Sequence, residues 1–258
     1  MTKNKAYVTL LITGLILTAI FSRVRDSRAI SQSLQLNQLT IRNMTSGFSV
    51  VSAISEGEKV SMSFRNDYAK PINGFTLSGG VNSGAQVDLI NGEHEILPNS
   101  LYTYRFAASN LEPSGSSTES LRITVLNVVF SDGTGDGDPQ ATADINNRRL
   151  GEQIALEHIV PIFDEVLKGP DLNTIQNTAL LRERIETICG SLIKQNPIEV
   201  QGGILHGKQY LLGDIEQAEK EMAPGSAISK AELQRIKEHY EKKSQNLKKA
   251  LLLHNTSR

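Results

Sequence analysis

The sequence predicts an α+β protein in which a membrane-targeting helix precedes an antiparallel β-sandwich and a C-terminal helical half. Three observations support this order. An apolar run occupies residues 6–21, apolar and polar side chains alternate with a period of two from about residue 34 to 130, and the period lengthens to three or four after Pro139. We therefore expect a signal peptide or signal anchor at 1–29, a β-sandwich at 33–134 and a helical domain at 139–253.

The composition is that of a folded chain without strong charge. Of the 258 residues, 39% are hydrophobic and 21% charged, and the formal net charge is -1. Such a balance gives no global attraction to nucleic acid, so we expect no nucleic-acid partner. The single cysteine, Cys189, excludes an internal disulfide. It lies beside Ile188 on an apolar stripe, which predicts a packed thiol and not a nucleophile.

The N-terminal run has the charge arrangement of a targeting segment. Lys3 and Lys5 precede it, as in secretory signals and signal anchors. The run is shorter than the roughly 17–25 residues that span a bilayer, which favours a cleaved signal. The small residues that a cleavage site needs, Ser27 and Ala29, lie far from the run, which favours retention. Both outcomes stay open, and either predicts a membrane-anchored or exported protein. The alternative to targeting is that the run forms a buried core helix.

The strands of the β half are predicted by alternating burial. The pattern is strong at 60–64, 102–106 and 121–125 and weaker at 34–41, 48–54, 72–77 and 87–90. In the last strand the apolar phase changes after Val125, which would turn the apolar side chains to the other face unless a bulge near Asn127 absorbs the shift. About seven short strands without an intervening helix are typical of two antiparallel sheets packed as an immunoglobulin-like sandwich.

Three segments of this half carry a family resemblance. Residues 60–72 (VSMSFRNDYAKPI), 96–98 (ILP) and 129–134 (VFSDGT) resemble small Ig-like domains of exported bacterial proteins of unassigned function, over about residues 33–134. The resemblance rests on strand and turn features and implies no catalytic activity. Where such domains have a known use, they contact another protein or the cell surface, so the resemblance implies a protein partner.

The junction between the halves is a candidate calcium site. In residues 132–138 (DGTGDGD), glycines alternate with the oxygen-bearing Asp132, Asp136 and Asp138 and a threonine, so these oxygens could converge on one cation. Ala143 stands where an EF-hand loop needs a bidentate Glu. The alternative is a Gly-rich turn followed by Asp138 as the N-cap of a helix that starts at Pro139. The pattern leaves both interpretations open.

After Pro139 the chain predicts four amphipathic helices. Gly and Pro residues interrupt the pattern at 169–171, 196–197 and 224–225, and each segment has one apolar stripe. Ser229 and Glu232 have capping-box spacing at the start of the last segment. Narrow stripes must bury against each other, which predicts a helical bundle or coiled-coil-like hairpins through which the chain could oligomerise.

Other chemical motifs are weak. The five histidines are scattered, and none forms a metal-binding pair at helical spacing. Gly202 and Gly203, with Lys208 nearby, lack the spacing of a phosphate loop and are interpreted as glycines near a helix start. We therefore expect no catalytic residue and a non-enzymatic interaction or structural module with an unidentified protein partner. The alternative is a ligand- or calcium-binding protein, or an enzyme, with its site at residues 132–138.

Overall fold

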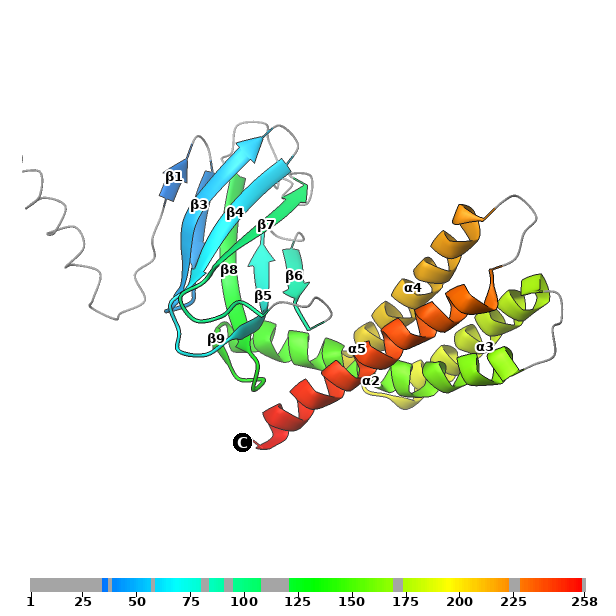
Figure 1. The fold of residues 1–258 in the computed structure, drawn as a ribbon. Helices are drawn as coiled ribbons and strands as arrows, with labels where there is room; N and C mark the ends of the chain where they lie inside the picture. Colours follow the sequence, from blue (N-terminus) through cyan, green and yellow to red (C-terminus); the bar gives the residue numbers. More distant parts are fainter. Residues whose placement is uncertain are drawn as a thin grey trace, which may run out of the picture.

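The computed structural model describes residues 34–36, 39–56, 59–79, 84–90, 95–107, 121–168, 174–222 and 228–256. The predicted targeting segment lies outside these residues, as do the helix breaks expected at 169–171 and 224–225. The described elements are β1 (Leu34–Leu36), β2 (Leu39–Asn43), β3 (Phe48–Glu56), β4 (Lys59–Asn66), β5 (Ile72–Ser78), β6 (Gly84–Asp88), β7 (Leu101–Ala107), β8 (Leu121–Phe130), β9 (Gly135–Gly137), α2 (Pro139–Lys168), α3 (Thr174–Gln195), α4 (Ile198–Glu221) and α5 (Lys230–Thr256). The strands gather in one half, and the helices extend from it as an elongated second half (Figure 1).

The strands form two sheets. The larger has the order β1-β2-β8-β5-β6, with β9 also paired to β8, and the smaller has the order β3-β4-β7. The smaller sheet is antiparallel, but the larger is mixed because β2 and β8 run parallel. The prediction of a purely antiparallel architecture was therefore wrong. Alternating burial shows which face of a strand is covered and carries no information about the direction of its neighbour.

Three phenylalanines join the sheets at the centre of the β half. Phe48 and Phe64 belong to the smaller sheet, and Phe75 belongs to the larger one. Their ring centroids lie 4.7 to 5.4 Å apart, and none of the three is exposed. Contacts of this length across two sheets mean that the sheets pack face to face around one core. The alternation predicted for residues 60–64 is confirmed, because the apolar positions of β4 face this core.

The bulge predicted near Asn127 is also confirmed. Asn127 pairs with Thr76 on β5 and Val125 pairs with Leu77, so Leu126 is the extra residue on β8. An extra residue shifts the side-chain phase by one, which keeps apolar residues on both sides of the bulge in the core.

The chain passes from sheet to helix without a flexible connection. β9 pairs with β8 so closely that a Cβ on Gly137 would lie 2.2 Å from the carbonyl oxygen of Leu126. Gly137 also has a φ of 98°, a left-handed conformation that favours glycine. α2 begins two residues later, at Pro139. The sheet edge therefore sets the position at which the helical half starts.

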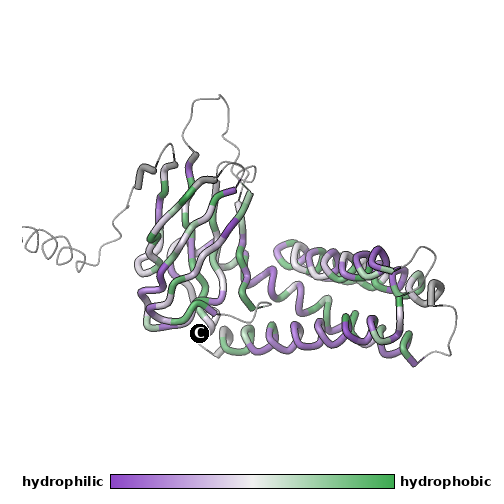
Figure 2. Tube along the Cα trace, turned by 45° about the horizontal axis from the view of Figure 1, so that its top comes forward, coloured by the Kyte–Doolittle hydropathy of each residue, from purple (hydrophilic) through white to green (hydrophobic). Residues whose placement is uncertain are grey.

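Four helices follow Pro139, as the sequence predicts. Successive helices run alternately away from and toward the β half (Figure 1), and α2 contacts each of α3, α4 and α5. Along each helix, hydrophobic and hydrophilic residues follow one another within every turn (Figure 2). The predicted apolar stripes form one buried cluster, which includes Leu156, Ile185, Leu211 and Ile236.

α2 and α4 pack with their backbones almost in contact. A Cβ on Gly203 of α4 would lie 2.1 Å from the carbonyl oxygen of Arg148, and a Cβ on Gly151 of α2 would lie 2.2 Å from that of Val200. Only glycine fits at either position. Gly203, interpreted from sequence as a loose glycine near a helix start, is therefore a packing residue of this helix crossing.

Candidate functional site

Two arginines in the third turn of α2 join the helical half to the β half. Arg149 donates from Nε to one oxygen of the Asp88 carboxylate and from Nη2 to the other, at 3.1 Å in each case, and Arg148 Nη2 adds a contact of 3.2 Å. Arg149 Nη2 also donates to the backbone and side-chain oxygens of Asn73, at 2.9 and 3.0 Å. Arg149 is 1% exposed, and its hydrogen bonds to Asp88 and Asn73 all go to residues of the β half.

This contact keeps Asp88 ionised although it is buried. Burial by itself raises the pKa of the carboxyl group. The charge and hydrogen bonds of Arg149, together with the charge of Arg148, outweigh burial and hold the pKa below its ordinary value. Asp88 also accepts from the backbone N–H of Ile90 at 3.1 Å, which bends the chain. β6 consequently ends at Asp88, and the strand predicted at 87–90 lies instead at Gly84–Asp88.

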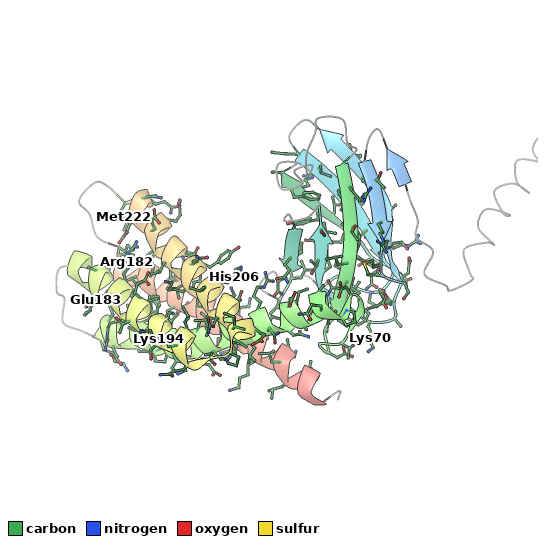
Figure 3. All side chains as sticks on the ribbon, turned by 180° about the vertical axis from the view of Figure 1, so that it is seen from behind. Lys70, Arg182, Glu183, Lys194, His206 and Met222 are labelled. Atoms are coloured by element: carbon green, nitrogen blue, oxygen red, sulfur yellow. The ribbon has the colours of Figure 1, made fainter. Side chains whose placement is uncertain are left out.

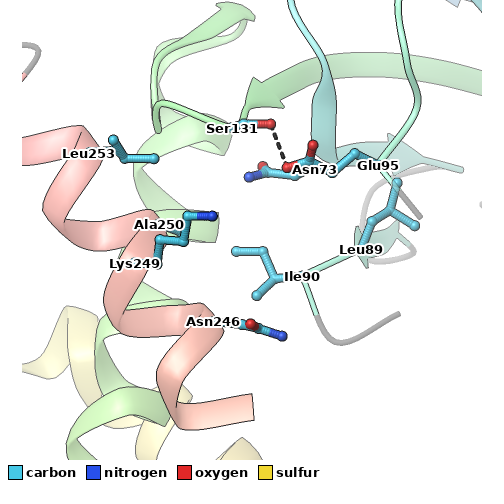
Figure 4. A pocket seen from close by; sticks show the side chains of 9 residues that line it. All are labelled: Asn73, Leu89, Ile90, Glu95, Ser131, Asn246, Lys249, Ala250 and Leu253. Atoms are coloured by element: carbon cyan, nitrogen blue, oxygen red, sulfur yellow. Dashed lines mark hydrogen bonds between the residues drawn. The ribbon is translucent and has the colours of Figure 1, made fainter. Parts of the chain in front are cut away.

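A cleft lies beside these ion pairs, between the β half and the C-terminal part of α5 (Figure 4). Its volume is about 360 Å³, and its walls are formed by Asn73, Leu89, Ile90, Glu95, Ser131, Asn246, Lys249, Ala250 and Leu253. Ser131 Oγ donates to the Glu95 carboxylate at 2.6 Å on the wall of the β half. Lys249 extends toward that wall from α5 (Figure 4). The cleft thus combines opposite charges, amides and apolar side chains, which is the mixture found in small-molecule sites.

The junction loop next to this cleft holds the three carboxylates predicted as calcium ligands, and the first of them binds protein donors. Asp132 accepts from Lys70 Nζ at 2.7 Å and from the backbone N–H and hydroxyl of Thr134 at 3.0 and 2.5 Å. Figure 3 shows Lys70 at the base of the β half, near the start of α2. Burial raises the pKa of Asp132, but the bonds from Lys70 and Thr134 outweigh it, so the pKa lies below its ordinary value.

Asp136 is held by a different set of donors. The backbone N–H and hydroxyl of Ser46 donate to its carboxylate at 2.6 and 3.0 Å, and the Tyr68 hydroxyl donates to the same oxygen. These bonds lower the pKa of Asp136 against the opposing effect of burial. Burial and the bond to Asp136 raise the pKa of Tyr68 to about 12, so its hydroxyl stays protonated and donates.

Asp138 is the N-cap of α2. Its carboxylate accepts from the backbone N–H groups of Gln140 and Ala141, at 2.8 and 3.4 Å, which confirms the predicted cap. In the parts of the chain that the structure describes, no three His, Cys, Asp or Glu side chains lie close enough to share a metal ion. The calcium site at Asp132, Asp136 and Asp138 stays a prediction.

A second buried charge cluster joins three helices. His206 Nδ1 of α4 donates to one oxygen of the Glu152 carboxylate on α2, and Lys243 Nζ of α5 lies 3.1 Å from the other oxygen. Lys243 also lies 5.5 and 5.9 Å from the ring centres of Tyr210 and Tyr240. Burial raises the pKa of Glu152, but the hydrogen bond from His206 and the charge of Lys243 outweigh burial and lower it. Figure 3 shows His206 on the side of the helical half that faces the β half.

Sequence reasoning missed both buried charge clusters, although the spacing contains a signal for them. Arg149 and Glu152 continue the apolar stripe of α2 toward its N-terminus, since Leu156 follows Glu152 at a spacing of four. Lys243 likewise falls on the stripe of α5, between Tyr240 and Leu247. A charged residue in phase with an apolar stripe is buried, and a buried charge needs a partner.

The remaining candidates have packing roles. Cys189 is 0% exposed, and burial raises the pKa of its thiol to about 11, which confirms the predicted packed thiol. Lys208, next to the Gly-rich part of α4, contacts Glu186 of α3 at 2.7 Å.

None of the helices that the structure describes has both the length and the apolar content needed to cross a bilayer. Comparisons with protein-family models, with curated proteins and with solved structures found no match to this chain.

Proposed function

We propose that the chain is an exported or membrane-attached, non-enzymatic protein that acts by binding another protein. In this proposal residues 1–29 target the chain to a membrane, and an Ig-like β half and a helical half form a rigid frame outside it. The apolar run at 6–21 behind Lys3 and Lys5 supports the targeting step. The buried contact of Arg149 with Asp88 and Asn73 supports the rigidity of the frame.

The observation that carries the binding role is an uncharged, exposed face on α4. Residues at spacings of three and four along this helix, Ile198, Gly202, Leu205, Gln209 and Gly213, are all exposed, and none is charged. Ile198 is 73% exposed and Leu205 38%. Faces of surface helices that point to water ordinarily carry charged side chains. We name this row the α4 face and assign it to contact with a protein partner.

Site-specific photo-crosslinking in the native host tests this role. A benzophenone amino acid at position 205 is expected to give a discrete adduct, and a second substitution, Ile198→Asp, is expected to abolish it. The same probe at Glu183, an exposed residue of α3, serves as the matched control. The mass of the adduct separates a second copy of this chain from a different partner. Equal adducts at 183 and 205, or an adduct at 205 that survives Ile198→Asp, would contradict the assignment.

Cell fractionation with intact-mass measurement tests the targeting step. A mature protein that lacks about the first 29 residues indicates export with cleavage. A full-length protein in the alkali-resistant membrane pellet indicates a retained signal anchor. A full-length protein in the soluble cytosolic fraction contradicts targeting.

A ligand-binding protein is the second candidate, and the cleft beside Ser131 favours it. If the ligand is calcium, the carboxylates of Asp132 and Asp136 coordinate the ion and give up their present hydrogen bonds to protein donors. Millimolar calcium would then raise the melting temperature of the full chain, and Asp132→Asn with Asp136→Asn would remove the rise. An unchanged melting temperature contradicts the calcium version and leaves the turn and N-cap interpretation.

A further inference from the structure

We propose that the cleft between α5 and the β half binds a small aliphatic zwitterion, namely an amino acid or dipeptide with an aliphatic side chain. This inference rests on the second candidate function, ligand binding at the junction, and is independent of the α4 face. It follows from three features of the cleft: a negative wall, a positive wall and an apolar surface between them.

The negative wall belongs to the β half. Glu95 accepts a hydrogen bond of 2.6 Å from Ser131 Oγ (Figure 4), but a hydroxyl is neutral and leaves the carboxylate charge uncompensated. Among the residues that the structure describes, no Lys, Arg or His forms an ion pair with Glu95. A ligand ammonium group placed here would make a charge-assisted hydrogen bond with this carboxylate.

The positive wall belongs mainly to α5. Lys249 extends into the cleft from this helix, and in the described part of the chain no carboxylate forms an ion pair with it. Asn73 faces it from the opposite side. Because Asn73 Oδ1 accepts from Arg149, its amide N–H₂ is the group left to donate toward the cleft. Asn246 supplies a second amide one turn before Lys249. A ligand carboxylate fits among these donors.

The space between the two walls is apolar and small. Leu89, Ile90 and Leu253 line it, so an aliphatic side chain would be buried against them. The volume of about 360 Å³ lies near the lower end of the roughly 300–1,000 Å³ typical of ligand pockets, which limits the ligand to an amino acid or a dipeptide.

Ligands with a single charge fit this arrangement less well. A free carboxylate or phosphate would find Lys249 but would face repulsion from Glu95, and a simple amine would find Glu95 but would face Lys249. A zwitterion neutralises both walls at once, and discrimination of this kind depends on the repulsive element as much as on the attractive one.

Calorimetric titration of the full chain in a non-ionic detergent tests the proposal with four probes. L-leucine and leucyl-leucine carry both charges, L-leucinamide lacks the carboxylate, and 4-methylpentanoate lacks the ammonium group. We expect saturable binding of at least one zwitterion and at least tenfold weaker binding of both single-charge probes. No saturable binding of either zwitterion up to about 10 mM, or equal affinity for the single-charge probes, overturns the proposal.

Two variants and a matched control place the ligand in this cleft. Lys249→Met and Glu95→Gln should each weaken binding at least tenfold. Lys248→Met changes the neighbouring lysine, which is 65% exposed and lies 3.9 Å from Glu157, and should leave the affinity within twofold. If Lys248→Met weakens binding as much as Lys249→Met, the ligand does not bind in the cleft. Since these titrations use purified protein, a negative result leaves the photo-crosslinking test of the α4 face unaffected.

Discussion

Arg149 is the residue on which the contact between the two halves depends most. Its guanidinium is buried, and all of its described partners belong to the β half. Burying a charge is unfavourable unless hydrogen bonds and an opposite charge compensate for it, and Asp88 and Asn73 supply both. The pair need not be more stable than apolar residues of the same size. Removal of one member is nevertheless costly, because the other stays buried without a partner.

Arg149→Met is therefore expected to lower the free energy of unfolding by about 3–5 kcal/mol, because it leaves Asp88 buried and unpaired. Urea denaturation measures the change. Arg65→Met is the matched control: Arg65 pairs with Asp67 at the surface with 49% of its side chain exposed, so its loss should cost at most about 1 kcal/mol. Equal losses in the two variants would show that Arg149 does not fasten the halves.

The two buried carboxylates predict that the fold is lost in acid. The pKa of Asp88 and that of Glu152 lie below their ordinary values of 3.8 and 4.5 in the folded protein. As the pH falls, these carboxylates therefore bind protons in the unfolded chain at a higher pH than in the folded chain. The stability that these groups contribute is complete above about pH 5 and is lost as the pH falls through 4.5 and below. The free energy of unfolding, measured from pH 6 to 3, should fall less steeply in Asp88→Asn than in the wild type. Parallel curves would contradict this prediction.

At the scale of the elements, the crossing of α2 and α4 depends on glycine, and two neighbouring glycines test it. In Gly203→Ala the new methyl group would lie 2.1 Å from the Arg148 carbonyl oxygen and push the helices apart. We expect a loss of about 1–3 kcal/mol. Gly202→Ala lies on the exposed side of the same helix, where the added methyl has no atom of another segment within 4 Å, and should stabilise the chain by about 0.5–1 kcal/mol through helix propensity. Thermal unfolding measures both changes, and melting temperatures that shift in the same direction in the two variants would contradict this account of the crossing.

Several elements could be predicted because their signals are local. The alternation in β4, the bulge beside Asn127 and the change of period at Pro139 each follow from neighbouring side chains, and the structure confirms all three. Caps are local as well. The backbone N–H of Glu232 donates to Ser229 Oγ at 3.1 Å, in agreement with the predicted cap of α5.

Other features could not be predicted because they join distant segments. The parallel pairing of β2 with β8 leaves the alternation in both strands unchanged. The apolar stripe of α2 indicates that Arg149 is buried, but no local pattern identifies Asp88 and Asn73 as its partners. The cleft needs α5 to return to the β half, which no local pattern indicates. Sequence alone therefore located the junction but not the residues that face each other across it.

At the scale of the whole molecule, the β half and the helical half are expected to move as one body. Three features join the β half to α2. β9 leads directly into the helix, Asn127 Nδ2 donates to Thr142 Oγ1 at 3.0 Å, and Arg149 forms its buried ion pair with Asp88. A fixed angle between the halves preserves both the cleft and the orientation of the α4 face. Preorganisation of this kind reduces the entropy lost on binding.

Pulsed electron spin resonance between the halves tests this rigidity most directly. Spin labels on cysteines introduced at Arg105 of β7 and Glu183 of α3 report the distance, while the native Cys189 is buried and should stay unlabelled. We predict one narrow distance distribution for the wild-type chain and a broader one for Arg149→Met. A broad distribution in the wild type, or an equally narrow one in the variant, would contradict a frame fastened by Arg149.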